Sequence, residues 1–93
     1  MRTICVVTAT RAEYGLLRPV VQKLATDTEV QLELVVTGAH LCTRLGETVR
    51  EIEADGFPIA ARLPIFSEQE EPVARTIART LTVFDEYFAA HRP

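Results

Sequence analysis

The chain has 93 residues, enough for one domain at most, and its 47% of hydrophobic and 25% of charged residues are ordinary for a soluble globular protein. Its formal net charge of −3 argues against nucleic acid or an anionic membrane surface as the main partner. No apolar run approaches the length of about 20 residues that crosses a bilayer, and the start of the chain lacks the pattern of a signal peptide. We therefore expect a cytoplasmic protein with no membrane partner.

The first predicted strand runs directly into a helix. Residues 4–7 are an unbroken apolar run, which is typical of a parallel strand that is covered on both faces. A helical pattern opens at Glu13 and continues to about Ala25, and we expect Pro19 to distort this helix locally without breaking it. Such a junction leaves unpaired backbone N–H groups and the positive end of the helix dipole at the carboxyl end of the strand.

This junction is the first candidate site, because ligands of open parallel sheets bind at the carboxyl ends of the strands. Arg11 adds a fixed positive charge there, so we expect an anion site, most simply for phosphate, over residues 8–15. The alternative is that Arg11 is a solvated loop arginine, since every α/β domain has such junctions. The stretch matches neither glycine-rich phosphate-binding pattern, and Gly15 is its only glycine.

The second predicted strand, about residues 30–36, delivers a second loop to the same edge of the sheet. In this loop, Gly38 permits a positive φ or a close backbone approach. His40 has two interpretations that the pattern leaves open. Either its ring hydrogen-bonds a ligand or a neighbouring loop, or it fixes only its own loop.

The remaining pattern predicts a helix that ends at Gly56, a short edge strand over residues 59–63 and a long helix over residues 72–90. Charged residues of the second helix, Glu51 among them, are interpreted as a solvated face. Its inward residues would be Leu45, Val49, Ile52 and Ala54. The long helix carries an apolar stripe that we expect to cover the sheet, consisting of Val73, Ile77, Leu81, Phe84 and Phe88.

The order β-α-β-α-β-α predicts an α/β fold with a parallel sheet. The last helix ends in residues 91–93 with no strand after it, so we interpret residues 1–93 as the N-terminal piece of a longer α/β protein. Cys5 is expected to act as a small apolar side chain, and a disulfide with Cys42 is not expected in a reducing compartment. His40 and Cys42 are too few ligands for a metal site, so we expect no metal.

Two blocks of the sequence resemble the hydrolysing UDP-N-acetylglucosamine 2-epimerases, which make N-acetylmannosamine for sialic-acid-type sugars. The first block is residues 8–19, with Arg-Ala-Glu-Tyr-Gly at its centre. The second comprises residues 36–41, 46–48 and 51–57. The resemblance covers essentially the whole chain. The non-hydrolysing branch carries a lysine where this chain has Leu16, which favours the hydrolysing branch.

The resemblance implies two Rossmann-like domains, as in the B-type glycosyltransferases, with the nucleotide sugar in the cleft between them. This chain would be the first part of the N-terminal domain. The implied reaction eliminates UDP to give a 2-acetamidoglucal, which is then hydrated to the 2-epimer without any cofactor. Family members are generally oligomeric, so a homo-oligomer is expected. The identity of the sugar stays open, and a diacetylated bacillosamine donor is one alternative to UDP-N-acetylglucosamine.

The resemblance also implies roles for four residues in substrate binding. Arg11 would contact the diphosphate or uridine side of the ligand, and Gly15 would allow close approach. His40 would line the sugar side of the cleft or hold that wall, and Glu13 would orient Arg11 or cap the helix. The acids and bases of catalysis would lie beyond this chain, because its remaining carboxylates are interpreted as surface residues: Glu68, Glu70, Glu71 and Asp85.

We therefore expect no catalytic residue in these 93 residues and no epimerase activity from this chain alone. Two other functions remain open at this point. One is a non-catalytic α/β module that binds a nucleotide or a protein partner. The other is a fragment of a different sugar-nucleotide enzyme, such as a glycosyltransferase.

Overall fold

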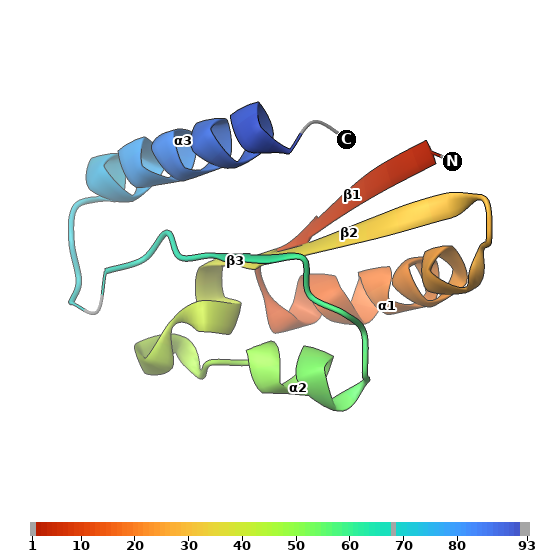
Figure 1. Ribbon diagram of the computed structural model, residues 1–93. Helices are drawn as coiled ribbons and strands as arrows, with labels where there is room; N and C mark the ends of the chain where they lie inside the picture. The colour runs from red at the N-terminus through yellow and green to blue at the C-terminus, as the bar shows by residue number, and fades with distance from the viewer. Residues whose placement is uncertain (1, 68, 92–93) are drawn as a thin grey trace.

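A three-stranded parallel sheet forms the centre of the computed structural model, which describes residues 2–67 and 69–91, without the side chain of Arg44. The strands follow the order β1 (Arg2–Thr8), β2 (Val30–Thr37) and β3 (Ala61–Leu63). The helices are α1 (Arg11–Thr26), α2 (Val49–Ala54) and α3 (Val73–Ala90), and two 3₁₀ turns, Gly38–Leu41 and Thr43–Leu45, precede α2. Figure 1 shows α1 and α2 on one face of the sheet and α3 on the other. This arrangement confirms the predicted α/β, Rossmann-like fold.

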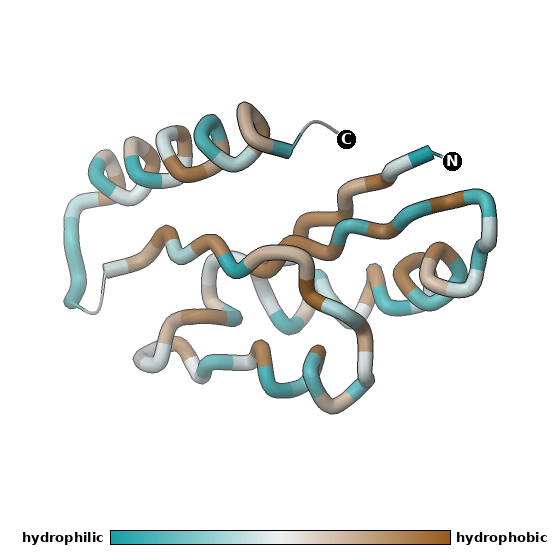
Figure 2. Tube along the Cα trace, in the orientation of Figure 1, coloured by the Kyte–Doolittle hydropathy of each residue, from teal (hydrophilic) through white to brown (hydrophobic). Residues whose placement is uncertain are grey.

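The core lies between the sheet and the helices α1 and α2. In the parallel pair β1–β2, Val6 is opposite Leu34 and Thr8 is opposite Val36. Because successive strand residues point to opposite faces, the even-numbered residues of both strands face these helices. The buried cluster consists of Tyr14, Val21, Leu34, Val36, Val49 and Ile52. Figure 2 shows hydrophobic residues along the two long strands and on parts of the helices.

Helix α1 begins two residues earlier than the periodicity predicted. Thr10 is its N-cap, and the Thr10 side chain accepts a hydrogen bond from the Glu13 backbone N–H at 3.1 Å. A threonine followed by glutamate three residues later is the sequence pattern of a capping box, so the start at Arg11 has a clear local cause. The helix continues through Pro19 without a break, as expected.

The second helical region is shorter than predicted. Val49 and Ile52 are buried as expected, but Leu45 is 43% exposed and Ala54 is also exposed, so the predicted inward face was wrong at these two residues. Leu45 ends a 3₁₀ turn and is followed by Gly46 in the left-handed conformation, which separates it from the face of α2. Gly56 has φ +82 and follows the end of α2, as predicted.

Strand β3 is limited to Ala61–Leu63, two residues shorter than expected, and it pairs in parallel with the end of β2. The preceding residue, Ala60, donates its backbone N–H to the Leu34 carbonyl oxygen at 2.8 Å. Within the described residues β3 lies at one edge of the sheet, and this confirms the prediction of an edge strand.

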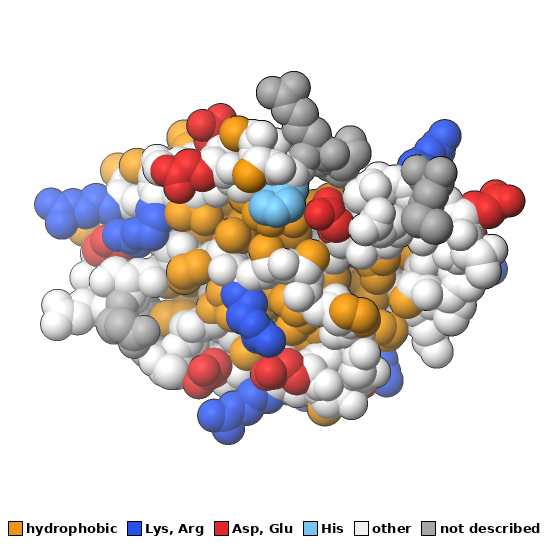
Figure 3. All heavy atoms as spheres, viewed as in Figure 1, with side chains coloured by type: hydrophobic (Ala, Val, Ile, Leu, Met, Phe, Trp, Pro, Cys, Tyr) orange, Lys and Arg blue, Asp and Glu red, His pale blue; other side chains and the backbone are white. Residues whose placement is uncertain are grey.

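Helix α3 buries the predicted stripe only in part, because only its two phenylalanines are half-buried. Val73, Ile77 and Leu81 are 73%, 54% and 68% exposed, so the expectation that they cover the sheet was wrong. The helix turns Tyr87 inward instead, with the Tyr87 hydroxyl 3.4 Å from a carboxylate oxygen of Glu33 on β2. Figure 3 shows hydrophobic side chains exposed in a band between α3 and the strands.

Polar contacts also anchor the segment before α3. Arg79 donates to the Ile65 carbonyl oxygen at 2.8 Å and forms an ion pair with Glu71. Glu71 is therefore half-buried and paired, which corrects its interpretation as a surface carboxylate. Glu70 and Asp85 are exposed as predicted, and Glu68 lies outside the described residues.

The predictions made for Met1 and for the Arg92-Pro93 end of the chain also fall outside the described residues. In the part that is described, no helix combines the length and the apolar character needed to span a membrane.

Candidate functional site

The two loops that follow β1 and β2 are in direct backbone contact. The backbone N–H of His40 donates to the carbonyl oxygen of Ala9 at 3.3 Å. A Cβ atom at Gly38 would lie 2.8 Å from that same carbonyl oxygen and 2.9 Å from the Ala9 Cβ, and Gly38 has φ +62. Both uses of this glycine that the sequence suggested, a positive φ and a close approach, therefore occur together.

His40 is completely buried beneath this contact, and both of its ring nitrogens have partners. Nε2 is 3.0 Å from the Thr8 hydroxyl at the end of β1, and Nδ1 is 2.8 Å from the Thr48 hydroxyl just before α2. Burial lowers the pKa of His40, although the charges of Glu13 and Glu51 raise it in part. A neutral ring donates through one nitrogen and accepts through the other, so it satisfies both threonines.

The structure thus favours the interpretation in which the His40 ring hydrogen-bonds neighbouring segments over the one in which it fixes only its own loop. Its side chain joins the end of β1, the loop after β2 and the start of α2, and it has no exposed surface in the part of the chain described here. This arrangement fits a residue that holds the wall of a binding cleft. Direct contact of His40 with a substrate stays a prediction.

Glu13 acts as a cap at the same junction. Its carboxylate accepts a hydrogen bond from the Ala9 backbone N–H at 2.7 Å, and its own N–H donates to the Thr10 hydroxyl. These bonds satisfy the backbone where the strand becomes the helix. Between the two roles considered for Glu13, the described contacts support capping.

Arg11, at the first position of α1, forms an ion pair with Glu51 on α2. The contact joins Nε and a carboxylate oxygen at 2.9 Å, and 73% of the Arg11 side chain is exposed. One to two turns farther along α1, the Tyr14 hydroxyl donates to Asp55 at 2.5 Å, and Arg18 lies 3.1 Å from the same carboxylate. Two ion pairs and a hydrogen bond therefore connect α1 to α2 and to Asp55, the C-cap residue of α2.

These side chains surround an open hollow of about 390 Å³ between α1 and α2, together with Gly15 and Ala54. Burial and the bond to Asp55 raise the pKa of Tyr14, so its hydroxyl remains a donor at neutral pH. A Cβ atom at Gly15 would have no heavy atom within 4 Å, so there is room beside it for a ligand.

Sequence analysis assigned no role to Arg18, and it placed Glu51 and Asp55 only on a solvated face. A usable signal existed in the spacing. Residues 11, 14 and 18, two arginines and a tyrosine, share one face of α1, and the carboxylates at 51 and 55 lie one helical turn apart. The sequence therefore contains a row of hydrogen-bond donors and a row of acceptors with matching spacing. The spacing does not reveal that the two helices meet, because the rows lie far apart in the chain.

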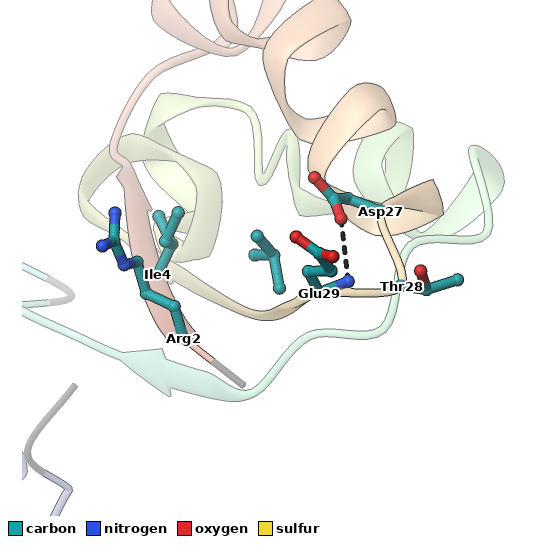
Figure 4. Close-up of a pocket in the computed structure, with 6 residues that line it drawn as sticks. Arg2, Ile4, Asp27, Thr28 and Glu29 are labelled. Carbon is teal, nitrogen blue, oxygen red and sulfur yellow. Dashed lines mark hydrogen bonds between the residues drawn. The ribbon is translucent and has the colours of Figure 1, made fainter.

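A larger hollow of about 710 Å³ lies at the opposite end of the sheet, where β1 and β2 begin. Figure 4 shows Arg2 and Ile4 from β1 beside Asp27, Thr28 and Glu29 from the turn before β2. Because parallel sheets bind ligands at the carboxyl ends of their strands, this hollow is at the wrong end to be the candidate site.

Neither cysteine is part of a disulfide. Cys42 is buried, whereas Cys5 is half-buried rather than enclosed in the sheet. Among the residues that the structure describes, no three His, Cys, Asp or Glu side chains are grouped closely enough to hold a metal ion.

The fold and the site together define the class of protein. This is a Rossmann-like α/β domain that presents an exposed arginine at its first strand-to-helix junction. The two loops at that edge are fixed by a buried histidine and a glycine contact.

Comparison with known proteins places this domain more narrowly. The chain is 39% identical over its whole length to the UDP-N,N'-diacetylbacillosamine 2-epimerase (hydrolyzing) of Legionella pneumophila, covering 25% of that protein. It is 33% identical over 99% of its length to the GDP/UDP-N,N'-diacetylbacillosamine 2-epimerase (hydrolyzing) of Campylobacter jejuni, covering 24% of it. It is 30% identical over 88% of its length to the UDP-N-acetylglucosamine 2-epimerase of Neisseria meningitidis serogroup B, covering 22% of it.

No family model matches the chain. These relatives nevertheless confirm its resemblance to the hydrolysing UDP-N-acetylglucosamine 2-epimerase family. The chain spans about a quarter of the length of the curated relatives it matches, which fits an N-terminal portion of such an enzyme.

Proposed function

We propose that these 93 residues form the N-terminal part of a hydrolysing 2-epimerase that acts on a UDP-linked 2-acetamido sugar. The observation that carries this proposal is the placement of Arg11. Its exposed guanidinium stands at the first strand-to-helix junction, in a chain that is homologous to such epimerases. The helix N-terminus adds its own attraction for the negatively charged diphosphate.

In the proposed reaction the proton at C2 of the sugar is removed and the bond from C1 to the UDP oxygen breaks, which gives a 2-acetamidoglucal and UDP. Water then adds its hydroxyl at C1 and its proton at C2 from the other side, and the 2-epimer is formed. Arg11 would bind the diphosphate that leaves. Gly15 would give the ligand room, while His40 and Glu13 would hold the loop and the helix start in place.

The sugar is the finer part of the proposal. One relative, with 39% identity, is named for UDP-N,N'-diacetylbacillosamine, and another, with 33% identity, is named for GDP/UDP-N,N'-diacetylbacillosamine. A relative with 30% identity is named for UDP-N-acetylglucosamine. The order of identities favours the diacetylated sugar over UDP-N-acetylglucosamine, which the motifs alone suggested first. Both substrates share the 2-acetamido group and the diphosphate, so the proposed role of Arg11 is the same for each.

The test uses the protein expressed from the complete coding sequence, incubated separately with the two UDP-sugars. UDP release and the free 2-epimeric sugar are measured for the wild type, for Arg11→Ala and for Arg62→Ala. Loss of one charge-assisted contact to phosphate predicts a kcat/KM about 10- to 100-fold lower in Arg11→Ala. Arg62 is the matched control because it is an exposed arginine whose partner, Glu53, lies outside the site.

A folded protein that is inert on both UDP-sugars would contradict the proposal. Transfer of the sugar to an acceptor with the configuration at C2 retained would indicate a glycosyltransferase instead.

A further inference from the structure

Glu51 lies beside the residues proposed to bind the substrate without being one of them. We propose that it is a positioning residue, which holds the guanidinium of Arg11 in the orientation that receives the diphosphate. This inference rests on the proposed function, because it gives Glu51 a role only through the ligand contact of Arg11.

The geometry of the ion pair suits such a role. Glu51 contacts Arg11 through Nε, and most of the Arg11 side chain is exposed, so the terminal N–H groups stay accessible to a ligand. Arginine recognises phosphate by donating two parallel N–H groups from its planar guanidinium. A guanidinium held on its Nε side can offer the terminal pair without first losing its rotational freedom on binding.

The residues on both sides of Glu51 in the chain are held by contacts with the rest of the protein. Ile52, the next residue along α2, is fully buried in the core, and Asp55, one turn farther, is bonded to Tyr14 and Arg18. In the first turn of α2, the Glu51 backbone N–H donates to the carbonyl oxygen of Thr48, the N-cap residue, at 3.0 Å. The Thr48 hydroxyl is bonded in turn to His40. Glu51 therefore projects from a helix that is fixed to both α1 and the loop after β2.

Fold stability alone does not account for this pair. Both side chains are substantially exposed, 73% for Arg11 and 45% for Glu51, and exposed ion pairs contribute little to the stability of a fold. The interaction is therefore expected to affect ligand affinity far more than it affects unfolding.

The first test measures the Kd for UDP of the complete protein by titration calorimetry, with thermal unfolding recorded in parallel. The wild type is compared with Glu51→Gln, Glu51→Ala and the matched control Glu53→Ala. Glu53 lies on the same helix and forms an exposed ion pair with Arg62 at 3.5 Å. If Glu51 restrains one long side chain, its removal weakens UDP binding by about two- to twelvefold and leaves the melting temperature nearly unchanged. Glu53→Ala binds like the wild type.

The second test asks whether Glu51 acts through Arg11. In the Arg11→Ala background, adding Glu51→Ala should cause no further loss of UDP affinity, because the group that Glu51 orients is already absent. With the substrate, Glu51→Ala should raise KM and change kcat by less than about twofold, since ground-state binding is what it supports.

Three results would overturn the inference while leaving the proposed function intact: Glu51→Ala binds UDP as well as the wild type, it binds more tightly, or its effect adds fully to that of Arg11→Ala. Tighter binding would mean that Glu51 competes with the ligand for Arg11. Wild-type binding of UDP by Arg11→Ala would instead refute the role proposed for Arg11 and, with it, that of Glu51.

Discussion

Gly38→Ala should destabilise the protein more than a change of one methyl group normally does. Two costs act together at this position. The left-handed conformation, φ +62, costs an alanine about 1–2 kcal/mol. The new Cβ would also meet the Ala9 carbonyl oxygen at 2.8 Å, and such overpacking costs about 1–3 kcal/mol because a backbone atom has to move. The expected loss in the free energy of unfolding is therefore about 2–5 kcal/mol.

Two other glycines of the chain separate these costs. Gly56 has φ +82, and a Cβ atom there would have no heavy atom within 4 Å, so Gly56→Ala should lose only the conformational part, about 1–2 kcal/mol. Gly15 lies inside α1 with the same open space, so Gly15→Ala should gain about 0.5–1 kcal/mol from better helix propensity.

The assay is urea unfolding of the complete protein, followed by circular dichroism and fluorescence for all three variants. The decisive quantity is the difference between Gly38→Ala and Gly56→Ala, expected at about 1–3 kcal/mol. Equal losses would refute the close contact of the two loops. UDP affinity measured beside it should fall in Gly38→Ala, because the loop that this glycine seats carries His40 next to the candidate site.

Two further predictions concern the polar groups buried next to this contact. Burial holds the pKa of His40 below its ordinary value of 6.5, so the unfolded chain takes up the proton first as the pH falls. The contribution of His40 to stability is therefore complete above about pH 6.5 and is lost at lower pH. Urea unfolding between pH 7.5 and about pH 5 should show this slope in the wild type, and an unchanged slope in His40→Gln would contradict it. Tyr14→Phe removes the hydrogen bond to Asp55 and should cost about 1–3 kcal/mol, measured at pH 7. A cost near zero would mean that Arg18 alone satisfies that carboxylate.

The parts of the fold that sequence predicted well are those with a strong local cause. An apolar run defines β1, another defines the end of β2, and helical periodicity defines α1 between them. Their parallel pairing follows from the crossover helix. The sequence also located both loops of the candidate site, because the carboxyl ends of neighbouring parallel strands share one edge.

Helix α3 shows where this reasoning stops. Its periodicity correctly predicted an apolar face, but periodicity does not tell which partner covers that face. In the described chain Val73, Ile77 and Leu81 are exposed, and the contacts of α3 with the rest of the protein include polar ones from Tyr87 and Arg79. Such contacts depend on the paths of separate segments, and no local pattern encodes them.

The pairing of Arg11 with Glu51 was missed for the same reason. Each residue looked like an ordinary charge on its own helix, and the contact exists only because α1 and α2 lie together on one face of the sheet. Glu13 was easier, since its capping role is local and was one of two alternatives that the sequence offered.

The titratable groups near this edge of the sheet already have hydrogen-bond or ion-pair partners, which bears on where the catalytic acid and base of the proposed enzyme would lie. Glu13 caps a helix, Glu51 holds Arg11, Asp55 bonds Tyr14 and Arg18, and His40 is buried between two threonines. A general acid or base must reach the proton that it transfers, either directly or through one water molecule. None of these four groups among the described residues is free to do so without breaking a contact that maintains the site. This arrangement supports the proposal that the 93 residues supply a rigid binding wall, while the groups that move protons at C2 come from elsewhere in the protein.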